Sequence, residues 1–232
     1  MDPRGPRVKC PFHEGALLFP CGSRLRARYP PGVGALALAL LLSFPAPPLV
    51  DATTIVPGLR VDIRYATNRN VVGRPLYRSA RCLLVPDVAR ALARAQGILR
   101  QRGFALMAWD CYRPLSAQRE LWRVYPHPGF VANPARGSNH NRGAAIDVTL
   151  VDLAGRPVAM PTDFDSFEPR AFQGATDGVS PEARANRDTL RTAMVTAGFR
   201  TIRREWWHYD FRGALARPLI LDTRAPPGRA AP

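Results

Sequence analysis

Two short segments of the 232-residue chain contain side chains that could hold a metal ion and move a proton. The first segment carries His140 and Asp147, and the second carries Glu205 and His208. Two histidines and one aspartate would give Zn²⁺ three ligands and leave the fourth tetrahedral position open for water, as in a catalytic site. Glu205 could then take the proton of that water. Spacing alone leaves open the alternative that His140 and Asp147 are a hydrogen-bonded pair in the core.

A strand over residues 144–151 would position the aspartate of the first segment. Its alternation places Asp147 on the face opposite to the apolar side chains of the strand, which are Ile146, Val148 and Leu150. A buried carboxylate needs a partner, because burial of an unpaired charge is costly. Gly143 allows the loop that carries His140 to fold back over this strand and supply one.

The second segment requires a bend. On a regular strand, side chains three residues apart point to opposite faces, so Glu205 and His208 would diverge. Glu205 must therefore sit at a bend before the strand if both side chains are to face one site.

The remaining pattern predicts helices and strands in mixed order. Helices are expected to begin at Pro86, Pro114 and Pro181 and to end before Gly103, by residue 125 and at Ala197. Strands are expected at 61–65, 104–109, 144–151, 201–202 and 206–211, with loops at 126–139 and 161–180. This order predicts an α+β single domain, with a central, mostly antiparallel sheet flanked by helices and the zinc site on a sheet face.

Three motifs carry a family resemblance. Residues 138–147 read SNHNRGAAID and match the pattern SxHxxGxAxD, residues 205–208 read EWWH and match ExWH, and residues 109–114 read WDCYRP. In this order they make the chain, over residues 59–212, resemble the D-alanyl-D-alanine dipeptidases, which are VanX-type zinc peptidases.

The resemblance implies a reaction and its residues. His140, Asp147 and His208 would bind one Zn²⁺ per chain, and Glu205 would be the general base. Arg113 would stabilise the oxyanion of the tetrahedral intermediate, for which a fixed guanidinium is well suited. The implied activity is zinc-dependent hydrolysis of D-alanyl-D-alanine to two D-alanines in peptidoglycan-related metabolism.

Shorter local motifs extend the resemblance to residues that would bind the substrate. Ser138 and Asp165 would hold the free ammonium group of the dipeptide, and Tyr65 matches a residue near the same end of the pocket. For Tyr65 the alternative is a packing residue, and for Arg113 it is a structural ion pair. The family's usual Asp-Gly-Tyr-Arg reads Asp-Cys-Tyr-Arg here, with Cys111 in place of glycine.

Related activities are open alternatives. A zinc D,D-carboxypeptidase or endopeptidase would share the ligand motif but act on longer peptidoglycan peptides. A non-catalytic zinc-binding module would be expected to lack the base or the oxyanion residue, and Glu205 and Arg113 are both present.

The net charge of +15 first suggests a polyanion as partner, but its distribution argues against nucleic acid. Lys9 is the single lysine among 33 basic residues, and the arginines are scattered rather than clustered in one stripe. Composition also excludes a multi-span membrane protein and a disulfide scaffold. The expected partner is therefore a small dipeptide, without nucleic acid.

The N-terminal region has the layout of an export signal. Arginines precede an apolar run at residues 34–44, prolines follow it, and Val50-Asp51-Ala52 fits a cleavage site. The predicted organisation is an export segment with a poorly ordered basic N-terminus at residues 1–52 and a periplasmic dipeptidase domain at 53–232, without stable membrane association after signal removal. An uncleaved anchor or a buried helix is the alternative, and the enzyme is cytoplasmic if the segment is not a functional signal.

Two cysteines, Cys82 and Cys111, follow the predicted cleavage site. In an oxidising compartment such a pair is a candidate disulfide, and both residues sit beside elements expected to pack together. Two buried thiols are the alternative.

Overall fold

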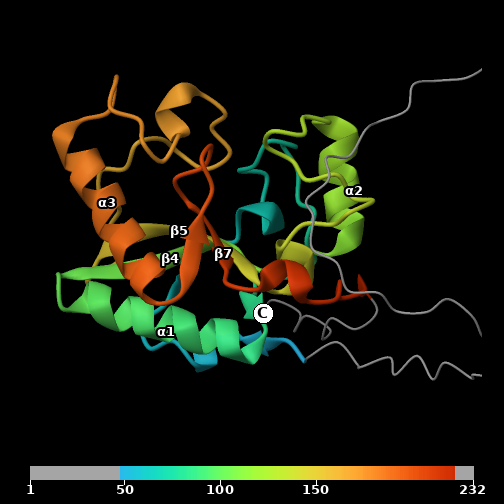
Figure 1. Ribbon diagram of the computed structural model, residues 1–232, viewed down its shortest axis with the longest axis horizontal. Coiled ribbons are helices and arrows are strands. Elements are labelled where there is room, and N and C mark those ends of the chain that lie inside the picture. The colour runs from blue at the N-terminus through green and yellow to red at the C-terminus, as the bar shows by residue number, and fades with distance from the viewer. Residues whose placement is uncertain (1–47, 223–232) are drawn as a thin grey trace, which may run out of the picture. The chain divides into compact units, whose positions relative to one another are not determined.

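A five-stranded mixed sheet forms the centre of the fold (Figure 1). The structure is a computed structural model and describes residues 48–222. The strand order is β2-β4-β5-β7-β6, and a separate two-stranded sheet pairs β1 with β3. The strands are β1 (Val50–Asp51), β2 (Arg60–Val61), β3 (Leu83–Leu84), β4 (Phe104–Asp110), β5 (Ala145–Asp152), β6 (Phe199–Thr201) and β7 (His208–Phe211). In the central sheet the β2–β4 pair is parallel and the other pairs are antiparallel, which confirms the predicted α+β class.

Within residues 48–222 three α-helices flank the sheet: α1 (Pro86–Arg100), α2 (Leu115–Val124) and α3 (Pro181–Thr196). Figure 1 shows α1 and α3 together on one side and α2 at the opposite end. The prolines correctly predicted where α1 and α3 begin, because proline is favoured in the first turn of a helix. In α3 the Ser180 hydroxyl also accepts a hydrogen bond from the backbone N–H of Ala183 at 3.1 Å. Short 3-10 helices lie at η1 (Ala52–Thr54), η2 (Arg64–Ala66), η3 (His140–Arg142), η4 (Pro169–Ala171) and η5 (Ala214–Ala216).

The central strand β5 is buried along nearly its whole length. Its apolar side chains Ile146, Val148 and Leu150 belong to the main core, together with leucines of α1 such as Leu92 and Leu99. Burial on both sides of β5 makes it a rigid platform for any polar side chain that it carries.

The two ends of the sheet differ from prediction. The predicted strand 61–65 is wrong beyond Val61, because β2 is a short edge strand and η2 turns the chain at Tyr65. The predicted strand 206–211 begins at His208 instead, since Trp206 lies in a turn and its N–H donates to Ala171 O at 2.9 Å. The end of β2 is set by its position at the edge of the sheet, and the start of β7 by a long-range hydrogen bond. A local residue pattern contains neither kind of information.

Cys82 and Cys111 form a disulfide, with Cα atoms 5.1 Å apart and a sequence separation of 29. This confirms the predicted pair. The bridge joins the chain before β3 to the residue that follows β4, where the backbone N–H of Tyr112 also donates to Leu83 O at 2.9 Å.

Replacing both cysteines by serine is expected to lower the free energy of unfolding by about 2–4 kcal/mol, because the unfolded chain loses a closed loop. Urea denaturation of wild type and of the Cys82→Ser/Cys111→Ser variant measures the difference. Adding a reductant should bring the free energy of unfolding of the wild-type protein close to that of the variant. Identical urea midpoints without reductant would contradict a stabilising bridge.

The predicted export segment lies mostly outside the described residues. Within them, Val50 and Asp51 form β1, and the N–H of buried Ala52 donates to Cys82 O at 2.8 Å. Cleavage after Ala52 would thus remove a strand, and the domain boundary stays a prediction. In residues 48–222 no helix combines the length and apolar character needed to cross a bilayer.

Candidate metal centre and active site

Three side chains converge on one face of the sheet: His140, Asp147 and His208. The Nε2 atom of His140 lies 3.2 Å from Nδ1 of His208, and Asp147 Oδ1 lies 2.9 Å from that Nδ1 and 3.4 Å from that Nε2. Tetrahedral ligands at about 2.0–2.1 Å from Zn²⁺ are about 3.3 Å apart. The three atoms therefore fit one face of a zinc coordination sphere.

The sheet register explains this convergence. Asp147 on β5 is directly opposite His208 on β7, so both side chains lie on the same face. His140 comes from η3, which is capped at its C-terminal end by Gly143 with φ +61°. The left-handed conformation favours glycine and turns the loop back toward β5, as the sequence predicted.

The ring of His140 is held by a backbone carbonyl. Its Nδ1 lies 2.8 Å from Cys111 O, so Nδ1–H donates and Nε2 keeps the lone pair that faces the cluster. Burial alone would raise the pKa of Asp147, but the two histidines hold that pKa below its usual range. Two imidazole nitrogens and a carboxylate are a donor set that binds a divalent cation once both rings are neutral.

A cavity of about 310 Å³ opens beside the three side chains. Glu205 lines it from the bend before β7, with its Oε2 3.9 Å from His208 Nδ1, which confirms the predicted bend. Burial raises the pKa of Glu205 to about 8. A carboxylate with a raised pKa is a stronger proton acceptor than an exposed one.

The bend that carries Glu205 is fixed by long-range hydrogen bonds. The backbone N–H of Gln173 donates to Arg203 O at 3.0 Å, and its side-chain amide donates to Trp206 O at 3.0 Å. The indole N–H of Trp206 donates to Thr162 Oγ1 at 2.9 Å. The buried Trp206 and Trp207 therefore serve to anchor the turn rather than to line the cavity.

Arg113 lines the same cavity and is held by two side chains. Its Nε and one terminal nitrogen donate to Asp110 Oδ2 at 3.0 and 2.7 Å, and the other terminal nitrogen donates to Gln118 Oε1 at 3.0 Å. The guanidinium group also lies 3.8 Å from Asp147 Oδ2. A fixed, buried cation beside the metal ligands is suited to an anionic oxygen.

The structure also reveals partners that the sequence reasoning missed. A β-bulge in β4 shifts the register, so that Ala108 is opposite Val148 but Asp110 is opposite Asp147. The bulge turns Asp110 toward the site. There Asp110 also accepts a hydrogen bond from Tyr77 Oη at 2.6 Å. The acid three residues before Arg113 in the sequence was the available signal, but the bulge that aims it leaves no local pattern.

The three residues expected to bind substrate are divided between two places. Ser138 lines the cavity, and its Oγ accepts from the backbone N–H of His140 at 3.2 Å. The Tyr65 ring lies under the Arg113 guanidinium at 4.9 Å, and its hydroxyl donates toward both Asp165 oxygens at 3.1 Å. Tyr65 and Asp165 do not line this cavity, and Asp165 borders a neighbouring cleft with Arg64.

Burial raises the pKa of Asp165 to about 7. Its backbone has φ +56°, and Oδ2 accepts from the Val71 N–H at 3.1 Å. Two donor groups, the Tyr65 hydroxyl and the Val71 N–H, do not fully replace the water that this carboxylate has lost, so a nearby cation would stabilise its charged form.

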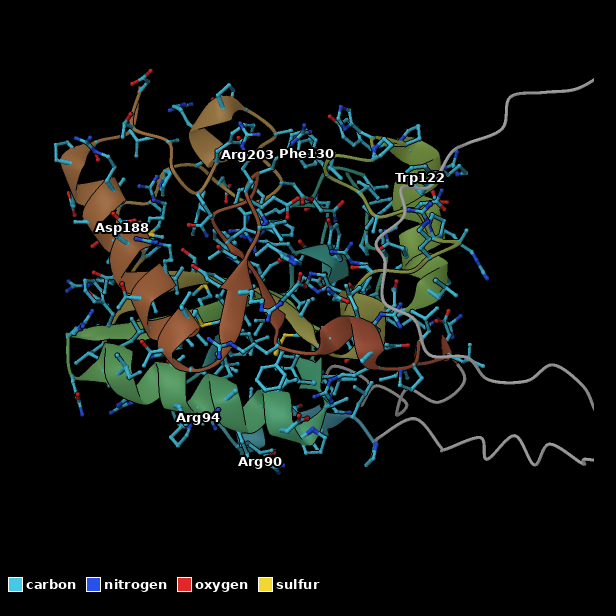
Figure 2. The ribbon with its side chains drawn as sticks, viewed as in Figure 1. Arg90, Arg94, Trp122, Phe130, Asp188 and Arg203 are labelled. Atoms are coloured by element: carbon cyan, nitrogen blue, oxygen red, sulfur yellow. A yellow bond between two sulfur atoms is a disulfide. The ribbon has the colours of Figure 1, made fainter. Side chains whose placement is uncertain are left out.

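The remaining cavity wall is largely apolar and comes mostly from loops. Figure 2 shows Phe130 on the side of the molecule away from Arg90 and Arg94 of α1. Arg204, beside Glu205, covers the Phe130 ring at 5.1 Å. The full lining is Arg113, Pro128, Gly129, Phe130, Ala132, Gly137, Ser138, Asn139, His140, Ile202, Glu205, His208, Asp210 and Leu215.

Comparison with known proteins identifies the family to which this site belongs. A family model described as D-ala-D-ala dipeptidase matches residues 46–225, which include every side chain of the site. The chain belongs to this family. As a member of the D-ala-D-ala dipeptidase family it is a peptidase, and its His/Asp/His cluster fits a metallopeptidase.

Relatives in this family align over most of both chains. A D-alanyl-D-alanine dipeptidase of Escherichia coli is 40% identical over 174 residues, covering 75% of this chain and 90% of the relative. Proteins of the same name from Enterococcus faecium and Streptomyces coelicolor are 34% and 36% identical, each covering 68% of this chain and 88% of the relative. The similarity therefore spans a whole dipeptidase rather than one motif.

Proposed function

We propose that this protein is a zinc-dependent dipeptidase that hydrolyses D-alanyl-D-alanine to two D-alanines. The observation that carries the proposal is one cavity of about 310 Å³ lined by two predicted metal ligands, a buried carboxyl group and a fixed guanidinium group. The third predicted ligand, Asp147, completes the cluster within 4.8 Å. The family and its relatives support the same substrate.

His140, Asp147 and His208 would hold one Zn²⁺ through Nε2, Oδ1 and Nδ1. When bound, zinc supplies Lewis acidity, which polarises a carbonyl group and makes water acidic enough to react near pH 7. The single carboxylate offsets part of the ion's charge, and the two neutral imidazoles leave the rest available for that chemistry.

Glu205 is the general base in this proposal. Its carboxylate borders the space next to the metal ligands, where it takes a proton from the attacking water and later delivers it to the departing amine. Its burial excludes bulk water, so the proton stays within the site.

Arg113 would stabilise the negative charge that develops on the carbonyl oxygen of the peptide bond. Asp110 and Gln118 occupy part of its donor set and hold the guanidinium plane in place. The remaining N–H groups are then oriented before the substrate arrives, and no reorganisation is needed during the reaction.

A free dipeptide is a small zwitterion, and the surroundings of the site suit its ammonium group. Asp165, supported by Tyr65, and the hydroxyl of Ser138 are proposed to bind this group. A bound ammonium ion would offset the burial of the Asp165 carboxylate. An acylated N-terminus offers no such charge, so longer wall peptides would bind less well.

The proposed location is the periplasm, with residues 1–52 as the export segment and 53–232 as the dipeptidase domain. The Cys82–Cys111 disulfide supports an oxidising compartment. In that location the enzyme would degrade dipeptide derived from peptidoglycan.

Substrate discrimination tests the proposal. Purified enzyme with zinc is expected to hydrolyse free D-alanyl-D-alanine but not a pentapeptide that ends in D-alanyl-D-alanine. Blocking the dipeptide's amino group with an acetyl group should lower kcat/KM about 10–100-fold, because a charge-assisted contact is lost. Cleavage of the pentapeptide without cleavage of the dipeptide would identify a carboxypeptidase or endopeptidase instead.

A further inference from the structure

The outer ring nitrogen of His208 faces a second carboxylate, Asp210. Nε2 of His208 lies 3.0 Å from Asp210 Oδ1, while Nδ1 of the same ring lies 2.9 Å from Asp147 Oδ1. A neutral imidazole carries one proton. Donation of that proton to Asp210 leaves the lone pair on Nδ1, which is the atom that faces the metal-ligand cluster.

The sheet places this carboxylate directly beside the ring of His208. His208 and Asp210 are two residues apart on β7 and therefore share one face. The residue opposite Asp210 on β5 is Ala145, whose small side chain leaves room beside the imidazole. Among ion pairs within 4.0 Å in residues 48–222, His208 is the one partner of Asp210.

The two histidines of the cluster are held in different ways. The outer nitrogen of His140 donates to the backbone carbonyl of Cys111 at 2.8 Å, and the Asp110 carboxylate lies farther away, at 3.4 Å. The outer nitrogen of His208 lies 3.0 Å from the carboxylate of Asp210, which lines the cavity and is 22% exposed. A charged acceptor pulls the ring proton more strongly, and this makes the opposite nitrogen a better electron-pair donor.

We propose that Asp210 is a positioning residue of the metal centre. Its carboxylate fixes the tautomer and the orientation of His208 and strengthens the bond from Nδ1 to Zn²⁺. This inference rests on the zinc site of the proposed function. It assigns to Asp210 a part of the zinc affinity.

The test measures the zinc Kd directly, by competition with a fluorescent chelator. Asp210→Ala is expected to weaken zinc binding about 10–100-fold. Asp210→Asn should weaken it less, because its amide oxygen still accepts the hydrogen bond but carries no charge. Asp177→Ala is the matched control, since it removes the same charge from an exposed position and should leave the zinc Kd unchanged.

Thermal unfolding of the metal-free proteins reports folding separately from metal affinity. Equal unfolding temperatures together with a weakened zinc Kd support a positioning role. An unchanged zinc Kd in Asp210→Ala overturns it, and if that variant does not fold, an unchanged Kd in Asp210→Asn does so. Failure of the wild-type protein to bind zinc would overturn the proposed function instead.

Discussion

Replacing Glu205 by alanine is expected to lower kcat for D-alanyl-D-alanine about 10²–10⁴-fold while zinc content stays at one ion per chain. Glu205 borders the cavity but contributes no atom to the His/Asp/His cluster. Its removal therefore takes away the proton acceptor and leaves the three ligand side chains in place.

The companion variant His208→Ala should lose both zinc and turnover, because it removes one of the three ligand atoms. Zinc content by elemental analysis and kcat by release of D-alanine distinguish the two variants. Glu205→Gln serves as the close isostere and should resemble Glu205→Ala. Full activity in Glu205→Gln would contradict a general-base role, and loss of zinc in Glu205→Ala would assign Glu205 to the metal instead.

Replacing Arg113 by alanine is expected to lower kcat about 10²–10³-fold, the usual effect of removing one oxyanion donor. A second effect follows from its partner, since Asp110 is fully buried and would lose both hydrogen bonds from the guanidinium group. Leaving a buried charge unpaired costs about 3–5 kcal/mol of stability. The variant should therefore be slow and also unfold at lower temperature.

Arg113→Lys separates the two effects. The lysine retains a positive charge near Asp110 but cannot reproduce the two-nitrogen contact, so stability should recover more than kcat. Thermal unfolding and steady-state kinetics on both variants measure this split. If kcat and stability recover together, Arg113 would be a structural ion pair, the alternative left open by its sequence context.

Much of the fold could be predicted because its signals are local. Pro86 and Pro181 mark helix starts in the sequence, and alternation along 144–151 correctly separates Asp147 from the apolar face. The bend at Glu205 also followed from local geometry, since a three-residue spacing cannot keep two side chains on one strand face.

The supporting contacts of the site could not be predicted in the same way. The bulge that aims Asp110 at Arg113 depends on the pairing of β4 with β5. The carbonyl of Cys111 that orients His140 is a backbone atom and leaves no mark in the residue pattern. The packing that places Tyr65 in η2, under Arg113, likewise arises from chain segments far apart in sequence.

Metal removal and reconstitution test the central claim most directly. Wild-type enzyme stripped of metal by a chelator and dialysed should show no hydrolysis of D-alanyl-D-alanine. Activity should return in proportion to added Zn²⁺ and reach its maximum at one equivalent per chain. Full hydrolysis by enzyme shown by elemental analysis to contain no metal would contradict the account.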